Sequence, residues 1–241
     1  MQPTNTISRW SIQECVPSGI EGEQVVLNLG VLVSGKGSDL QSLIDAITEG
    51  YLTEAKIVVV ISNKADSYAL ERAEKAGIPA IFIEFRKRQR LDFDKDMIEV
   101  LKKYKVDLVV MAGFMRLVTP EFVTAFKDHI INIHPALLPS FPGTHGHRDA
   151  LAWGVKVSGC TIHFLDEQMD HGPIIIQRAV EVLQNDTEET LSERILAHEH
   201  DQLPKAIKLY ARGSLEVKDR KVRIKEELPG FKEWLALKKN K

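Results

Sequence analysis

Short runs of apolar residues, most of them rich in valine and isoleucine, recur along the chain from residue 25 onward. The first five runs cover residues 25–33, 57–61, 80–83, 108–112 and 130–133. Uninterrupted apolar runs of this length are typical of strands that are buried on both faces of a parallel sheet. The pattern therefore predicts five buried strands.

The segments between these runs have the spacing of amphipathic helices. They cover residues 40–49, 67–76, 92–105 and 120–126, the last with a proline at a position that suits the first helical turn. Regular alternation of strand and helix predicts right-handed crossovers and a doubly wound, mostly parallel sheet of the α/β class, with helices on both faces. In such sheets ligands bind beyond the carboxyl ends of the strands.

The second half of the chain continues the same pattern. A helix ending near Gly154, strand-like runs at 159–164 and 174–180, and a helix over 188–210 are expected to complete a single domain, residues 26–213. Residues 1–25 are polar and aperiodic, which predicts an irregular extension. Residues 214–241 alternate basic and apolar positions and then end in a short helical pattern, so we expect a solvated hairpin and tail.

Composition narrows the class of protein. The chain has 241 residues, of which 44% are hydrophobic, and its formal net charge is −2. This profile excludes disorder of the whole chain. It also leaves no excess of basic residues that could bind the phosphate backbone of a nucleic acid. Two cysteines predict neither a disulfide framework nor a zinc site. No apolar stretch reaches the roughly 18 residues that span a bilayer, and no signal-peptide pattern begins the chain. We expect a cytoplasmic protein without a membrane partner.

A glycine-rich segment follows the first predicted strand and precedes the first predicted helix. Its sequence is Ser34-Gly35-Lys36-Gly37-Ser38. Backbone amides and the helix dipole at this position suit an anion. The third glycine of a dinucleotide fingerprint and the ending of a Walker loop are both missing, and no acidic residue closes the second strand. The segment predicts a monophosphate site or, alternatively, an ordinary tight turn.

The fifth predicted strand ends in two polar residues, Asn132 and His134. Because side chains alternate along a strand, both point to one side at the edge where ligands bind. A prolyl-rich loop follows, which favours a site over a purely structural histidine. Farther on, Asp166, Glu167 and Asp170 occupy a turn-like segment between two strands, either as part of that site or as a hydrated acidic loop.

An amide, a histidine and a carboxylate together suit acyl transfer to an amine that the substrate brings. The amide and a protonated imidazole can stabilise a tetrahedral oxyanion, while a carboxylate holds the imidazolium and helps to remove the amine proton. No nucleophile from the protein is needed. Cys160 lies in the middle of a predicted strand, so a cysteine hydrolase is disfavoured.

Several motifs occur together in an order that resembles one known family. They are Asn132-Ile133-His134-Pro135-Ala136-Leu137-Leu138-Pro139, Pro142-Gly143, His145-Gly146-His147, Gly159-Cys160-Thr161-Ile162-His163-Phe164 and Asp170-His171-Gly172-Pro173. With the glycine-rich segment, they make residues 27–217 similar to the phosphoribosylglycinamide formyltransferases. The resemblance implies a Rossmann-like formyltransferase fold. It also implies transfer of a formyl group from 10-formyltetrahydrofolate to glycinamide ribonucleotide in purine synthesis, without a metal.

The resemblance also assigns residues to roles. It implies that Asn132, His134 and Asp170 are the catalytic amide, general acid and supporting carboxylate. The implied ribonucleotide site comprises Gly37, Ser38, Asp39 and Glu199. The implied folate site comprises Arg90, Met115, Arg116, Leu117, Val118, Asn132 and His163, with the loop that leads to Asp170. We expect a monomer or a homodimer.

Some positions depart from the family's pattern or have a second interpretation. Asp39 stands where asparagine is usual, which adds negative charge beside a phosphate unless its carboxylate caps the helix or points away. Arg116 could form a salt bridge at the sheet edge instead of lining a pocket. The basic run 86–90 is interpreted as a solvated loop, except for Arg90.

Three other functions compete with this one. Formyltetrahydrofolate deformylase would use water in place of the amine but carries an additional N-terminal domain. Methionyl-tRNA formyltransferase carries an additional C-terminal RNA-binding domain. A non-catalytic nucleotide-binding module would keep the glycine-rich segment but would have no reason to bring Asn132, His134 and Asp170 together.

Overall fold

A computed structural model describes residues 26–226, 228 and 230–239. In its first half, strands and helices alternate as the apolar pattern predicts. The elements are β1 (Leu27–Val33), α1 (Ser38–Thr48), β2 (Ala55–Ser62), α2 (Tyr68–Lys75), β3 (Ala80–Phe82), α3 (Arg90–Lys103), β4 (Leu108–Met111), α4 (Pro120–Ala125) and β5 (Ile130–His134). All five strands and four helices of the prediction are present, and their ends agree to within two residues. Thr119 caps α4 by accepting a hydrogen bond from the Phe122 amide, and Pro120 begins that helix.

The second half adds longer strands and a long helix. Its elements are α5 (Gly146–Trp153), β6 (Val157–Phe164), β7 (Ile174–Glu181), α6 (Glu188–Ala211), β8 (Leu215–Lys218), β9 (Lys221–Ile224) and α7 (Phe231–Lys239). The helix before Gly154 ends there because this glycine takes the left-handed conformation of a helix C-terminus. A Thr187–Thr190 capping box begins α6.

The described strands form one sheet in the order β3-β2-β1-β4-β5-β6-β7-β9-β8. Strands β1 to β5 are parallel to one another, whereas β6 runs antiparallel to both β5 and β7. The predicted mostly parallel α/β class is therefore confirmed. The strand order reverses between β1 and β4, and ligands of doubly wound sheets bind beside this point, beyond the carboxyl ends of the strands.

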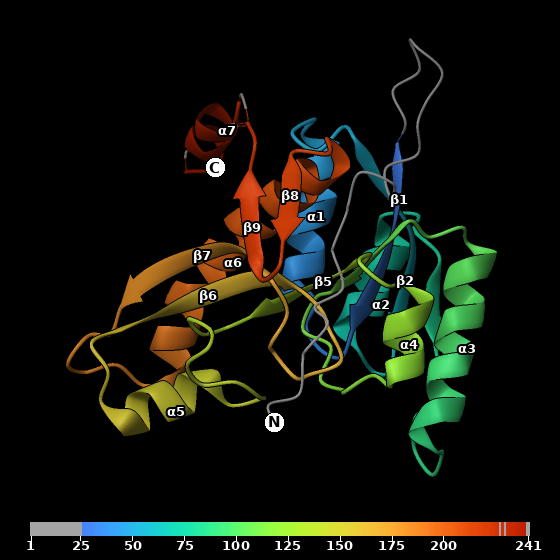
Figure 1. Cartoon of the computed structure of the whole chain (residues 1–241), viewed down its shortest axis with the longest axis horizontal. Helices are drawn as coiled ribbons and strands as arrows, with labels where there is room; N and C mark the ends of the chain where they lie inside the picture. Colours follow the sequence, from blue (N-terminus) through green and yellow to red (C-terminus); the bar gives the residue numbers. More distant parts are fainter. Residues whose placement is uncertain (1–25, 227, 229, 240–241) are drawn as a thin grey trace, which may run out of the picture.

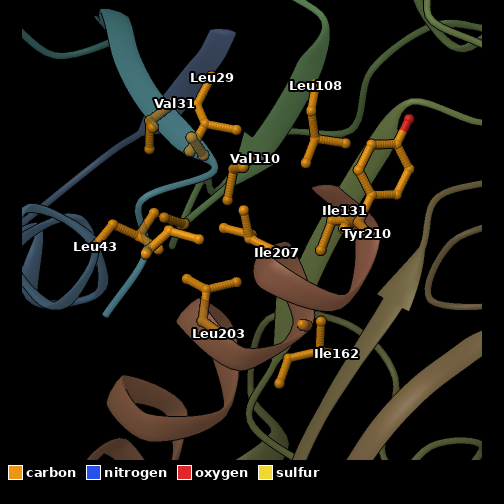
Figure 2. Close-up of a cluster of buried hydrophobic side chains, with 14 of the residues drawn as sticks. Leu29, Val31, Leu43, Leu108, Val110, Ile131, Ile162, Leu203, Ile207 and Tyr210 are labelled. Atoms are coloured by element: carbon orange, nitrogen blue, oxygen red, sulfur yellow. The ribbon is translucent and has the colours of Figure 1, made fainter. Parts of the chain in front are cut away.

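Helices cover both faces of the sheet (Figure 1). On one face, α1 and α6 pack against β1, β4, β5 and β6, and the side chains of Leu29, Leu43, Val110, Ile131 and Ile207 interdigitate there (Figure 2). On the other face, α3 and α4 bury phenylalanine and methionine side chains against the same central strands. Since both faces are covered, the central strands are predominantly apolar, and β5 turns polar at Asn132 and His134, where it reaches the carboxyl edge.

The C-terminal hairpin is part of the sheet. Strand β9 pairs with β7 through Ile174 and Lys221, and β8 lies outside β9. The basic residues of the hairpin are exposed, but Leu215 and Val217 are buried. The expectation of a solvated hairpin is thus wrong for one of its two faces, because the alternate apolar residues complete the core beside α6. Helix α7 then stacks Trp234 on Tyr51 with ring centroids 4.2 Å apart.

Two further expectations concern the first residues of the chain and membrane-spanning helices. The irregular extension over residues 1–25 lies outside the described residues. Within the described part of the chain, no helix has both the length and the apolar character needed to cross a membrane.

Candidate active site

The end of β5 places an amide and an imidazole at the carboxyl edge of the parallel strands. Asn132 and His134 project to the same side, while the alternate residues Ile131 and Ile133 are buried in the core. His134 is only 3% exposed, and its Nε2 lies 2.8 Å from the carbonyl oxygen of Phe141. The carbonyl acceptor fixes Nε2 as a donor and therefore fixes the ring orientation.

Asp170 comes from the loop between β6 and β7 and meets His134. Its Oδ2 lies 3.5 Å from His134 Nδ1, and its Oδ1 lies 3.9 Å from His163 Nε2. The backbone amide of Gly143 donates a hydrogen bond of 2.7 Å to Oδ2. Both nitrogens of His134 thus face an acceptor, one the Phe141 carbonyl and the other the Asp170 carboxylate.

His163 orients the amide of Asn132. Its Nδ1 donates to the Phe164 carbonyl over 2.8 Å, so Nε2 accepts from the Asn132 Nδ2, 3.1 Å away. The side chain is fully buried, and burial lowers its pKa from the usual 6.5, which keeps the ring neutral. One N–H of Asn132 is held by His163, which leaves the second N–H free to point into the adjoining cleft.

These groups lie at one end of a cleft of about 350 Å³. It is lined by the segment after β4, by the end of β5 and by the loop before β7: Met111, Gly113 to Val118, Asn132 to Pro135, Gly143, Thr144 and Leu165 to Asp170. Three apolar side chains on its lining, Met115, Leu117 and Met169, are more than half exposed. A cleft of this size with an apolar lining and a few converging polar groups suits a small organic ligand.

The predicted folate residues divide into two groups. Met115, Arg116, Leu117 and Val118 line the cleft, as does Asn132, whereas His163 acts from behind it through Asn132. Arg90 does not line the cleft; it is an exposed residue at the start of α3. The structure therefore does not bring Arg90 together with the rest of this group.

Arg116 has an aromatic partner that sequence reasoning missed. Its guanidinium lies 3.8 Å from the ring centroid of Phe85, a cation–π distance. Phe85 belongs to the connection before α3, and no spacing signal in the sequence could link it to residue 116. Of the two interpretations of Arg116, the structure favours the cleft wall over a salt bridge at the sheet edge.

The glycine-rich segment forms the start of α1, beyond the end of β1. Gly37 has φ 69°, and a Cβ atom there would lie 2.5 Å from Ala69 Cβ, so the position requires glycine. Ser38 is the first residue of the helix. The Ser34 hydroxyl donates to Asn63 Oδ1 over 2.6 Å and accepts from the Met115 amide over 2.9 Å. This bridge fixes the segment relative to the cleft.

Asp39 and Glu199 come together beneath the glycine-rich segment, although 160 positions separate them. They are 7% and 6% exposed, and α1 packs against α6 at this point. Burial raises the pKa of Asp39 to about 7. Burial, and then the charge of Asp39, raise the pKa of Glu199 well above its usual value. The nearest basic group, His200 Nε2, lies 3.8 Å from Asp39 Oδ1.

Neither of those two facing atoms has a hydrogen-bond partner among the described residues. Asp39 does not cap α1 with its side chain, so this explanation for the unusual aspartate does not apply. Sequence reasoning identified Asp39 and Glu199 but missed His200, whose position next to Glu199 in a helix carries no signal of its own.

Cys160 cannot serve as a nucleophile in this fold. Its side chain is fully buried in β6, and burial raises the pKa of its thiol to about 12. The described residues also contain no group of three or more His, Cys, Asp or Glu side chains placed to hold a metal ion. Asn132, His134 and Asp170 can together support proton transfer and oxyanion stabilisation.

Comparison with known proteins places this geometry in a family. Residues 27–207 match the family described as formyl transferase. The chain is 40% identical over 194 residues to the phosphoribosylglycinamide formyltransferase of Escherichia coli K12, which covers 79% of this chain and 90% of the relative. A crystal structure of glycinamide ribonucleotide transformylase 1 from Symbiobacterium toebii superposes with a TM-score of 0.83 at 47% identity, covering 87% of this chain and 99% of that chain.

Some relatives are much longer. The chain is 46% identical over 203 residues to the trifunctional purine biosynthetic protein adenosine-3 of Drosophila pseudoobscura pseudoobscura, a match of 83% of this chain. The chain spans only 15% of the length of that relative. It thus corresponds to one part of the trifunctional protein and to nearly all of the bacterial enzyme.

Proposed function

The chain belongs to the formyl transferase family, and from this premise we propose that it is a phosphoribosylglycinamide formyltransferase of purine biosynthesis. It moves the formyl group of 10-formyltetrahydrofolate to the amine of glycinamide ribonucleotide. The observation that carries the proposal is the convergence of Asn132, His134 and Asp170 at one end of the cleft. The identity to enzymes named for this reaction supports it over the related deformylase.

The residues supply the parts of an acyl transfer to an amine. The amine nitrogen of the ribonucleotide attacks the formyl carbon, and the C=O π bond breaks to leave an oxyanion. The free N–H of Asn132 and the His134 imidazolium stabilise this oxyanion. Asp170 keeps the imidazolium in place and helps to take the proton from the attacking amine. The C=O double bond then re-forms as the bond between the carbon and N10 of the folate breaks, and the proton taken from the amine passes through His134, the general acid, to N10.

In this proposal the two substrates bind to different parts of the site. The folate lies in the cleft against Met115, Arg116, Leu117 and Val118, whose apolar and cation–π environment suits a flat heterocycle. His163 supports it through Asn132, and Arg90 would reach only the outer end of the folate. Gly37, Ser38, Asp39 and Glu199 hold the ribonucleotide, with its phosphate at the start of α1.

A substrate-dependence assay tests the proposal. Formation of tetrahydrofolate from 10-formyltetrahydrofolate is followed with and without glycinamide ribonucleotide, and formate is measured in parallel. The proposal requires turnover that depends on the ribonucleotide and yields the formylated product. Release of formate at the same rate without any amine would instead identify a deformylase.

The setting of the enzyme is part of the same proposal. It acts in the cytoplasm as a monomer or a homodimer on small-molecule substrates, without nucleic acid or membrane partners. Light scattering coupled to size-exclusion chromatography measures the oligomeric state directly. A stable higher oligomer would contradict this part of the proposal.

A further inference from the structure

The loop that carries Asp170 leaves the sheet and returns to it within a few residues. It begins after Phe164, the last residue of β6, and ends at Pro173, whose carbonyl accepts a 2.9 Å hydrogen bond from the Phe164 amide. A Cβ atom on Gly172 would lie 1.8 Å from the Phe164 carbonyl oxygen, so only glycine fits at this narrow neck. Within this loop, every residue from Leu165 to Asp170 lines the cleft.

Asp170 is held in an unfavourable backbone conformation. Its φ is 51°, in the left-handed region that residues other than glycine seldom adopt, although aspartate tolerates it better than most. The contacts of its carboxylate with Gly143 and His134 account for part of that restraint. The next residue, His171, contacts both Asp166 and Arg220, and these contacts restrain the backbone beside Asp170.

Asp166 fastens the two halves of the loop to each other. Its Oδ1 accepts a 2.9 Å hydrogen bond from the Gln168 amide, and its Oδ2 lies 2.8 Å from His171 Nδ1. Since a carboxylate only accepts, His171 Nδ1 is the donor. In the neutral ring Nε2 then carries the lone pair and faces away from Asp166.

Arg220 packs against the same ring from another part of the chain. It lies in the turn between β8 and β9, and Figure 1 shows the hairpin beside the strands that the loop connects. Arg220 Nη1 lies 2.9 Å from His171 Nε2 and 3.0 Å from His171 Nδ1, so the guanidinium lies against the ring, and Nη2 donates to the His171 carbonyl oxygen. One guanidinium therefore binds both the side chain and the backbone of the residue that follows Asp170. Arg220 also lies beyond residues 27–207, which match the family.

We propose that Arg220, together with His171 and Asp166, forms a latch that positions Asp170 for formyl transfer. The proposal rests on the proposed function for the role of Asp170. In this proposal Arg220 contacts neither substrate and acts as a positioning residue for Asp170. Because the three side chains are partly or fully exposed, the latch adds little to global stability. Its effect falls on the local opening of the loop, which a few exposed hydrogen bonds can control.

The test is Arg220→Ala, compared with Arg223→Ala as a control on the same hairpin. Arg223 is an exposed arginine of β9, so its removal changes the net charge equally. Arg220→Ala is expected to lower kcat by about three- to tenfold and to raise the KM for the folate, whereas the KM for the ribonucleotide and the melting temperature stay unchanged. Arg220→Lys, which retains one of the two contacts, should give intermediate values. Arg223→Ala should match the wild type.

Two results would overturn the latch. One is a kcat for Arg220→Ala equal to that of the wild type. The other is a uniform loss in kcat and both KM values with a lowered melting temperature, which would show general damage to the hairpin.

Hydrogen exchange separates the latch from the proposed function. The Gly143 amide donates to Asp170, so its exchange reports the position of the loop without any turnover. Faster exchange in Arg220→Ala supports the latch even if the wild-type protein fails to formylate the ribonucleotide. Unchanged exchange in Arg220→Ala contradicts the latch even if the wild-type protein is fully active.

Discussion

Two buried polar clusters lie at the same edge of the sheet, and they are built in opposite ways. At the end of β5, the ring nitrogens of His134 and His163 and the carboxylate of Asp170 all face polar partners. At the start of α1, Asp39 Oδ1 and His200 Nε2 face each other at 3.8 Å without a hydrogen bond from any described residue. The first cluster is oriented before a ligand arrives. In the second cluster, these two atoms keep their hydrogen-bonding capacity unused.

The difference shows how one edge can serve two tasks. Stabilising a short-lived oxyanion requires groups whose directions are fixed in advance, since reorganisation during the reaction would cost rate. Binding a charged ribonucleotide requires groups that can still accept or donate. A buried carboxylate without a partner is costly in its ionised form, which is why the pKa of Asp39 is raised to about 7.

The largest effect is expected from removing the imidazole of the oriented cluster. His134→Ala should lower kcat by about 10² to 10⁴, the range for loss of a general acid, and should leave the affinity for a folate analogue nearly unchanged. Steady-state kinetics and a binding titration measure the two quantities, and an unchanged melting temperature confirms that the variant folds. A kcat close to that of the wild type would remove His134 from the mechanism.

A smaller effect, on stability, is expected in the second cluster. The folded protein keeps a proton on Asp39 up to about pH 7, whereas the unfolded chain releases it near pH 4. Stability from this group is therefore complete below pH 4 and falls as the pH rises toward 7. Asp39→Asn abolishes this titration, so its advantage over the wild type in free energy of unfolding should grow by about 1 to 3 kcal/mol between pH 4 and pH 8.

Urea unfolding at both pH values measures this difference. An advantage that is equal at pH 4 and pH 8 would mean that Asp39 ionises in the folded protein as it does in the unfolded chain. Such a result would remove the contrast between the two clusters.

The smallest effect is expected at the start of α1. Ser38→Asp adds an anion where the phosphate is proposed to bind, and it should raise the KM for the ribonucleotide by about tenfold without changing the KM for the folate. Thr48→Asp adds the same charge at the other end of α1 and is the matched control. Equal KM values in both variants would mean that the glycine-rich segment has only a structural role.

The sequence predicted the fold better than it predicted the long-range contacts. Buried parallel strands are apolar throughout, so β1 to β5 were visible as runs, and alternation placed Asn132 and His134 on one side. Asp170 received its role through the family resemblance. Its contact with His134 depends on a loop whose path no local pattern determines.

The remaining misses share one physical cause. The pairing of β9 with β7, the approach of His200 to Asp39 and the contact of Arg220 with His171 all join distant segments. Periodicity reports only which face of an element is buried, not which element it meets. The hairpin was therefore expected to be solvated. Its alternating basic residues indicate that one face is exposed to solvent, but they do not reveal that the other face is covered.

A double-mutant cycle tests the central claim, that His134 and Asp170 act as one unit in formyl transfer. The kcat of His134→Ala, Asp170→Asn and the double variant is measured with saturating glycinamide ribonucleotide and 10-formyltetrahydrofolate. The account predicts that the double variant is scarcely slower than the slower single variant, because either change disables the same unit. Losses that multiply would show two independent groups and would contradict the account.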